Sequence, residues 1–174
     1  PPFMKPRHCI SFMCTAFDEP SLDMLVQLDV DILKVASFDL GNLSFLNKFA
    51  QSARPVVLSV GGGKAIHIDT TVQFLEDLGV ELAVLHCVSE YPCRHEDLGL
   101  SKIKNMVVQF PNHLIGLSDH FSGTLSGPIG YMCGARIFEK HVTLNRAWKG
   151  TDHSFALEAK GFQSFVRDIR RASE

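Results

Sequence analysis

Short apolar runs alternate with amphipathic stretches along the whole chain. Six such runs begin about 22 to 32 residues apart and cover 9–14, 31–36, 55–59, 82–87, 114–118 and 136–142. Runs of this length, separated by longer amphipathic segments, predict β-strands that alternate with helices. Because the runs are continuously apolar, we expect a parallel sheet that is buried on both faces.

The segments between the runs carry apolar residues at helical spacing. The stripes that we expect to face the sheet are Leu22, Leu25, Val26 and Leu28; Val72, Leu75 and Leu78; Ile103, Met106, Val107 and Phe110; and Phe162, Phe165, Val166 and Ile169. Gly79 follows the second stripe and predicts a helix C-cap. The last helix, over 158–172, ends in basic residues that suit its dipole. Six βα units fit either an open doubly wound sheet or part of an eight-stranded barrel.

Composition narrows the class of protein. A chain of 174 residues fits one domain, here 1–174. With 17 basic and 19 acidic residues, its charge balance does not suggest a basic surface for nucleic acid or for a membrane. No apolar run reaches the roughly 18 residues of a membrane helix, and we do not expect the N-terminal Pro-Pro-Phe-Met-Lys to be a signal peptide. Five cysteines without metal-finger spacing favour free thiols in a reducing cytoplasm.

Polar residues gather where the predicted strands end, and ligands bind there in both architectures. His120 follows the fifth strand and His141 lies at the end of the sixth. Neighbouring strands lie about 4.8 Å apart, so the two imidazoles can share one divalent cation. Ser118 would point with His120, and Glu139 with His141, because residues i and i+2 share a face. The alternative is two unrelated polar residues on loops.

Lys34 interrupts an otherwise apolar strand, and a buried lysine is costly without an anionic partner. It can face a phosphate or carboxylate, or form a salt bridge with Asp31 or Asp39. Asp152 lies on a loop beyond the last strand, where it can cap a helix or move a proton. The glycines at 61–63 allow close backbone approach to an anion or make a flexible turn. Neutral hydrogen-bond donors near Lys34 would be Thr15, Ser37 and Ser59.

Several separated motifs, in order and at matching spacing, resemble the N-acetylneuraminate synthase family. They are CTAFDEPSLDMLVQLDVDILKVASFDLGNLSFL (14–46), PVVLSVGGG (55–63), LHCVSEYP (85–92), IGLSDHFSGTLSGPIGYMCGARIFEKHVTL (115–144) and WKGTDHSFALEAKGF (148–162). The resemblance implies a (β/α)₈ TIM-barrel fold. It also implies a cytoplasmic, homo-oligomeric transferase that condenses phosphoenolpyruvate with an N-acylated hexosamine such as N-acetylmannosamine, using Mn²⁺ or Mg²⁺.

The resemblance also implies roles for individual residues. His120 and His141 would ligate the metal, and Asp39 would lie near the reacting carbon. Tyr91 would contact the sugar, and Asp152 would lie near the metal. Lys34, Asp39 and Asp152 are the residues expected to act in catalysis. The residues expected around phosphoenolpyruvate are Thr15, Lys34, Ser37, Ser59, Ser89 and Ser118.

The match departs from the family in two respects. Val60 and Val88 replace hydroxyl residues at two strand ends, so a different nonulosonic acid is an alternative product. The match covers family strands three to eight, and we expect neither the first two βα units nor the C-terminal antifreeze-like domain. Two further alternatives are a non-catalytic truncated barrel that acts as a binding or assembly module, and a related 3-deoxy sugar acid synthase.

Overall fold

The computed structural model describes residues 10–174, and the chain divides into two compact units between Ala83 and Val84. Strands and helices alternate throughout both units. In the first unit, β1 pairs in parallel with β2, and β2 pairs in parallel with β3. Its elements are β1 (Met13–Thr15), α1 (Glu19–Gln27), β2 (Ile32–Val35), the 3₁₀ turn η1 (Ser37–Asp39), α2 (Leu43–Gln51), β3 (Val56–Ser59) and α3 (Ala65–Asp77).

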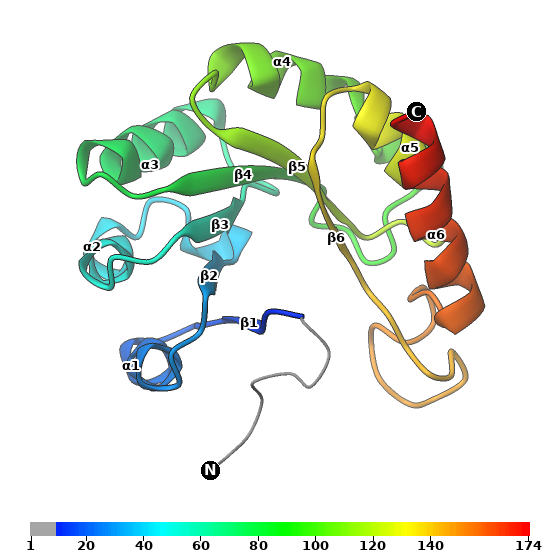
Figure 1. The fold of residues 1–174 in the computed structure, drawn as a ribbon, viewed down its shortest axis with the longest axis horizontal. Coiled ribbons are helices and arrows are strands. Elements are labelled where there is room, and N and C mark those ends of the chain that lie inside the picture. Colours follow the sequence, from blue (N-terminus) through cyan, green and yellow to red (C-terminus); the bar gives the residue numbers. More distant parts are fainter. Residues whose placement is uncertain (1–9) are drawn as a thin grey trace. The chain divides into compact units, whose positions relative to one another are not determined.

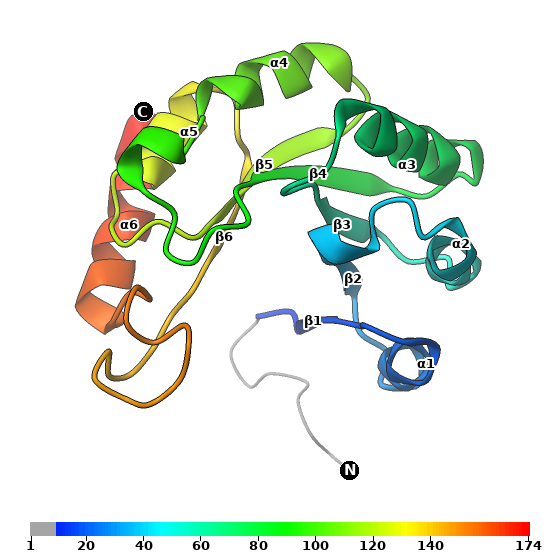
Figure 2. The ribbon, with the colours of Figure 1, turned by 180° about the vertical axis from the view of Figure 1, so that it is seen from behind.

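The second unit repeats this arrangement. Strand β4 lies next to β5, and β5 pairs in parallel with β6. Within each unit the helices lie along one side of the strands, as both ribbon views show (Figures 1 and 2). The elements are β4 (Leu82–Cys87), which begins just before the boundary, η2 (His95–Asp97), α4 (Ser101–Gln109), β5 (Leu114–Asp119), α5 (Ser126–Met132), β6 (Ile137–Lys140) and α6 (Ala159–Ala172).

Local sequence signals explain several helix ends. The carboxylate of Asp18 accepts a hydrogen bond from the Ser21 amide at 2.8 Å and caps α1. Asn42 caps α2 through the Phe45 amide at 3.4 Å. Gly79, with a φ of 73°, comes directly after the C-cap residue Leu78 in the left-handed conformation, so it ends α3 as predicted, one position beyond the cap.

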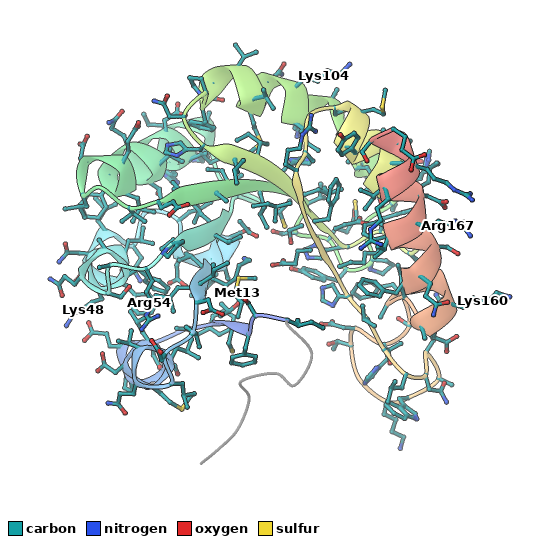
Figure 3. All side chains as sticks on the ribbon, in the orientation of Figure 1. Met13, Lys48, Arg54, Lys104, Lys160 and Arg167 are labelled. Atoms are coloured by element: carbon teal, nitrogen blue, oxygen red, sulfur yellow. The ribbon has the colours of Figure 1, made fainter. Side chains whose placement is uncertain are left out.

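In β3 and β4 the buried core confirms the prediction that the apolar runs form strands buried on both faces. Strands β3 and β4 are buried at every position, which is the pattern of a parallel sheet covered by helices. Each predicted helical stripe supplies residues to the core, among them Leu22, Leu25, Val72, Leu75, Ile103, Met106, Phe110 and Phe165. Charged side chains lie on the opposite faces, and Lys104, Lys160 and Arg167 point away from the strands (Figure 3).

Some predicted boundaries and core positions were wrong. Strand β1 begins at Met13, four residues after the predicted start at Cys9, which itself lies outside the described residues. Strand β6 is shorter than the predicted 136–142. Leu28 and Leu78 are exposed because each is the C-cap residue, beyond the last buried turn. Val107 and Phe162 are also exposed, on the flanks of their buried stripes.

The described residues were also searched for membrane spans. None of the helices within residues 10–174 combines the length and the apolar character that crossing a bilayer requires.

Close packing around Gly116 in β5 gives a test of the fold. A Cβ atom added there would lie 2.4 Å from Leu85 Cδ2 and 2.5 Å from the Ile137 carbonyl oxygen. We expect Gly116→Ala to lower the free energy of unfolding by about 1–3 kcal/mol, because the neighbouring backbone must move. Gly161, in α6, is the matched control, since its added Cβ would meet atoms no closer than 3.4 Å. Gly161→Ala should be neutral or stabilise by up to about 1 kcal/mol. Urea unfolding of both variants checks the pair, and equal stability would contradict the packing.

Buried His86 predicts a pH dependence of stability. It is 4% exposed, and its Nε2 lies 2.8 Å from the Leu98 carbonyl oxygen. Burial lowers the pKa of His86 below its usual 6.5, although the hydrogen bond to Leu98 acts in the opposite direction. The unfolded chain therefore binds this proton at a higher pH than the folded chain does. The contribution of neutral His86 to the free energy of unfolding is complete at a pH above the pKa that His86 has in the unfolded chain. It is lost as the pH falls toward the lower pKa that His86 has in the folded chain.

Urea unfolding between about pH 7 and pH 5 measures this effect. The wild-type chain should lose stability over that range. His86→Gln keeps an amide donor for Leu98 but cannot titrate, so its stability should fall less steeply. Parallel pH profiles for the two proteins would show that His86 does not contribute.

Candidate functional site

The predicted residues of the first unit gather around Lys34, near the carboxyl ends of its strands. Lys34 is 5% exposed, and its Nζ donates hydrogen bonds to Ser59 Oγ at 2.8 Å and to the Val35 carbonyl oxygen at 2.9 Å. Thr15 is the residue opposite Lys34 in the β1–β2 pairing, so both side chains point to the same face. The structure thus joins Lys34 to Ser59 and places Thr15 beside them, as the sequence predicted.

Ser37 and Asp39 follow in the 3₁₀ turn directly after β2. The Gly61 amide donates to Ser37 Oγ at 2.7 Å, so the glycine-rich turn after β3 packs on this hydroxyl. Asp39 is 3% exposed, and its Oδ1 accepts from Asn42 Nδ2 at 3.3 Å. Its Oδ2 is buried and has no hydrogen-bond partner within residues 10–174. A buried carboxylate oxygen without a donor is costly, and a ligand that supplies a positive or hydrogen-donating group would stabilise it.

Four residues of the second unit lie at the carboxyl ends of β5 and β6 or directly after them: Ser118, His120, Glu139 and His141. Ser118 and Glu139 are opposite each other in the strand pairing, and the Ser118 hydroxyl donates to Glu139 Oε1 at 2.5 Å. Two residues later, directly after the ends of the strands, His120 and His141 lie with ring centroids 5.3 Å apart. The predicted proximity of the two imidazoles is therefore observed.

Hydrogen bonding and burial prepare His120 to act as a neutral ligand. Its Nδ1 lies 2.6 Å from the Val88 carbonyl oxygen, which requires a proton on Nδ1 and leaves Nε2 with the lone pair. Burial lowers the pKa of His120, and the nearby His141 lowers it further, while the bond to Val88 opposes both. The neutral form, which binds metals, is therefore favoured near neutral pH.

His141 has a carboxylate beside it. Its Nδ1 lies 3.5 Å from Asp152 Oδ2, an arrangement that can orient the ring as carboxylates do for metal-bound histidines. Within the part of the chain that the structure describes, no three His, Cys, Asp or Glu side chains converge as a metal site. A cation bound by His120 and His141 would therefore have to take its other ligands from water or substrate.

Aromatic rings border the two histidines. The Tyr91 ring lies 4.0 Å from the His120 ring and 6.1 Å from the His141 ring, measured between centroids. Burial raises the pKa of Tyr91, and the charges of Cys87, Asp152 and Glu139 raise it further, so its hydroxyl stays protonated. Ser89, by contrast, is exposed on the loop after β4.

Sequence reasoning missed Phe155. Its ring lies 5.0 Å from His141 and 6.1 Å from Tyr91, again between centroids, and the residue is 2% exposed. The only signal was its place three residues after Asp152 in a loop already singled out. Phe155 packs against His141 and limits the directions that its ring can take.

The sequence of this chain is similar to those of known proteins over nearly its whole length. The NeuB family model matches residues 5–174. N-acetylneuraminate-9-phosphate synthase from Homo sapiens is 34% identical over 161 residues, which cover 92% of this chain and 45% of that protein. N,N'-diacetyllegionaminic acid synthase from Legionella pneumophila is 32% identical over 168 residues, which cover 94% of this chain and 47% of that protein.

A solved structure agrees with these relatives. The N-acetylneuraminic acid (sialic acid) synthetase of Leptospira borgpetersenii superposes with a TM-score of 0.87 at 36% identity, over 91% of this chain and 55% of that one. This likeness confirms the (β/α)-barrel class expected from the sequence. The chain spans about half the length of the curated relatives that it matches. With the family model covering residues 5–174, the chain belongs to the NeuB family, which includes synthases of sialic and other nonulosonic acids.

Proposed function

We propose that the chain carries catalytic residues of a synthase that joins phosphoenolpyruvate to an N-acylated amino sugar, giving a nonulosonic acid and phosphate. The observation that carries this proposal is the facing pair His120 and His141, next to Ser118 and Glu139, in a chain of the NeuB family. Membership of the family supplies the reaction class. The two histidines would supply a place for the divalent metal that we propose for this condensation.

His120 and His141 would hold a divalent cation through their Nε2 atoms. Two nitrogen ligands favour a transition ion such as Mn²⁺ over Mg²⁺, which prefers oxygen and keeps its water. When bound, the ion would supply Lewis-acid polarisation of the open-chain sugar aldehyde. Asp152 would orient the His141 ring, and the Tyr91 hydroxyl would donate a hydrogen bond to the sugar.

The residues around Lys34 would bind phosphoenolpyruvate. The Lys34 ammonium, already oriented by Ser59, offers a charge-assisted hydrogen bond to a phosphate or carboxylate oxygen. The hydroxyls of Thr15 and Ser37, in the same unit, would add neutral donors. The resemblance also assigns Ser89 and Ser118 of the second unit to phosphoenolpyruvate. None of these groups changes charge, so their task is to hold the substrate in position.

Bond formation then follows from the chemistry of the substrate. The methylene carbon of phosphoenolpyruvate bonds to the aldehyde carbon. The aldehyde C=O double bond opens, its oxygen takes up a proton and becomes a hydroxyl, and positive charge develops on the adjacent carbon that bears the phosphate. Water adds to that carbon and releases a proton, which balances the proton taken up by the aldehyde oxygen. The C–O bond to phosphate then breaks as the added hydroxyl loses its proton to the phosphate, which leaves the keto acid and inorganic phosphate. The buried Asp39 carboxylate would stabilise the positive carbon and help to position the water.

Replacement of either histidine tests the proposal. We expect His120→Ala and His141→Ala each to abolish Mn²⁺-dependent formation of sugar acid, because one imidazole cannot hold the ion. Mass spectrometry of the product, from phosphoenolpyruvate with N-acetylmannosamine or its 6-phosphate, makes the measurement, with a chelator as the blank. His67→Ala, at an exposed histidine of α3, is the matched control and should keep full activity.

Two results would contradict the proposal. Product formed equally in the chelator, or by the double histidine variant, would remove the metal from the reaction. A folded chain that binds Mn²⁺ and phosphoenolpyruvate without turnover would instead identify a binding module.

Loss of the Lys34 charge should weaken binding of phosphoenolpyruvate. We expect Lys34→Met to raise the dissociation constant about 10- to 100-fold, the usual effect of losing a hydrogen bond to a charged group. Lys48→Met is the control, because Lys48 is an exposed partner of Glu19 in the same unit. Isothermal titration with phosphoenolpyruvate measures both. Equal affinities would show that Lys34 stabilises the fold and does not bind the substrate.

A further inference from the structure

We propose that the buried ion pair between Asp119 and Lys140 is a positioning device, which fixes the alignment of β5 with β6 and thereby directs His120 and His141 toward one cation. Lys140 Nζ lies 2.6 Å from Asp119 Oδ2, and the two side chains are 2% and 0% exposed. This inference rests on the proposed metal role of the two histidines. Nothing in that role by itself calls for a buried charge pair beside them.

The pair occupies the opposite face of the strands from the histidines. Asp119 and Lys140 are partners in the β5–β6 pairing, one step beyond Ser118 and Glu139. Successive side chains alternate between the two faces of a strand, so the ion pair lies on the helix-covered face. Along the chain it comes after Ser118 and Glu139 and before the two histidines. A covered charge pair therefore sits at the point where both histidines leave their strands.

Strand β6 needs such a device. It has four residues, and Ile137, Phe138 and Glu139 are all half-buried, so apart from the Lys140 side chain its burial does not distinguish one face from the other. Alignment is weakly specified in a strand of this kind. A slip by one residue would move Lys140 onto the histidine face and would separate the buried carboxylate from its charge partner. Leaving a buried charge unpaired is strongly unfavourable, so the pair selects a single alignment.

Asp119 also shapes the turn that carries His120. Its Oδ1 accepts from the Phe121 amide at 3.0 Å, and its Oδ2 accepts from the Ser126 hydroxyl at 2.5 Å. Lys140 donates in addition to the Phe121 carbonyl oxygen. The backbone on both sides of His120 is thus tied to the ion pair, and the His120 carbonyl oxygen accepts from the Cys93 amide at 3.0 Å.

If the Asp119–Lys140 pair served only to stabilise the fold, any substitution that kept the two strands folded would leave the histidines in place. Buried ion pairs can often be replaced by apolar residues of similar volume without loss of stability. The double variant Asp119→Leu/Lys140→Met removes both charges together, so neither is left unpaired. This variant therefore tests whether the ion pair aligns the histidines, in a protein that still folds.

The test measures Mn²⁺ affinity of the chain by isothermal titration, with circular dichroism as the check on folding. We expect the double variant to fold and to bind Mn²⁺ about 10- to 100-fold more weakly, the usual effect of losing groups that orient metal ligands. Ser126→Ala removes one hydroxyl from Asp119 and should weaken binding about threefold. The control is Arg167→Met/Asp168→Asn, which removes an exposed ion pair of α6 and should leave the affinity unchanged.

A readout without metal separates this inference from the proposed function. The His120 ring lies against Tyr91, so its ring-proton chemical shifts report its position. We expect these shifts to move in the double variant, and to a smaller extent in Ser126→Ala. A wild-type chain that does not bind Mn²⁺ would overturn the metal role, while the shifts would still test the positioning role. Unchanged shifts and unchanged affinity in a folded double variant would overturn the positioning role. If that variant does not fold, wild-type values in Ser126→Ala would overturn it.

Discussion

The alternation of side chains along paired parallel strands is the constraint on which the candidate site depends. Ser118 and Glu139 are bonded across β5 and β6, so the residues two positions further on, His120 and His141, must face the same side. Asp119 and Lys140 must then face the helices, where burial makes their pairing obligatory. One alignment of two short strands thus determines which polar groups are available to a ligand and which are held inside.

Buried polar groups distinguish the functional strand ends from ordinary ones. Lys34 and Asp39 in the first unit, and His120 in the second, are each at most 5% exposed and lie at or just beyond the ends of strands. Such groups cost free energy unless each hydrogen bond is made. Lys34 meets that requirement with Ser59, whereas one oxygen of Asp39 has no donor within residues 10–174. The fold tolerates this cost at a position that the proposed reaction uses.

Much of the fold followed from the sequence because parallel strands and their helices have distinct apolar patterns. Strands β3 and β4 matched the predicted runs closely, and Gly79 ended α3 as expected. The ends of elements were harder to predict, because Leu28 and Leu78 continue the helical pattern although each is a cap residue. Phe162 shows the same limit, since periodicity identifies the apolar face but not how far the sheet covers it.

The candidate site was predictable in part for a similar reason. Strand spacing alone brought His120 and His141 together, and the structure agrees. No pattern in the sequence identified Phe155, because its contact with His141 depends on the path of an irregular loop. The Asp119–Lys140 pair also lay within quoted motifs, but its burial and its link to Ser126 are visible only in three dimensions.

The central claim is that His120 and His141 hold one divalent cation. Anomalous diffraction from crystals of the chain grown with Mn²⁺ tests it most directly, because the signal locates the ion itself. We predict one peak within coordination distance of the Nε2 atoms of both histidines. A peak bound by carboxylates elsewhere, or density that leaves both imidazoles without an ion while Mn²⁺ occupies another site, would contradict the account.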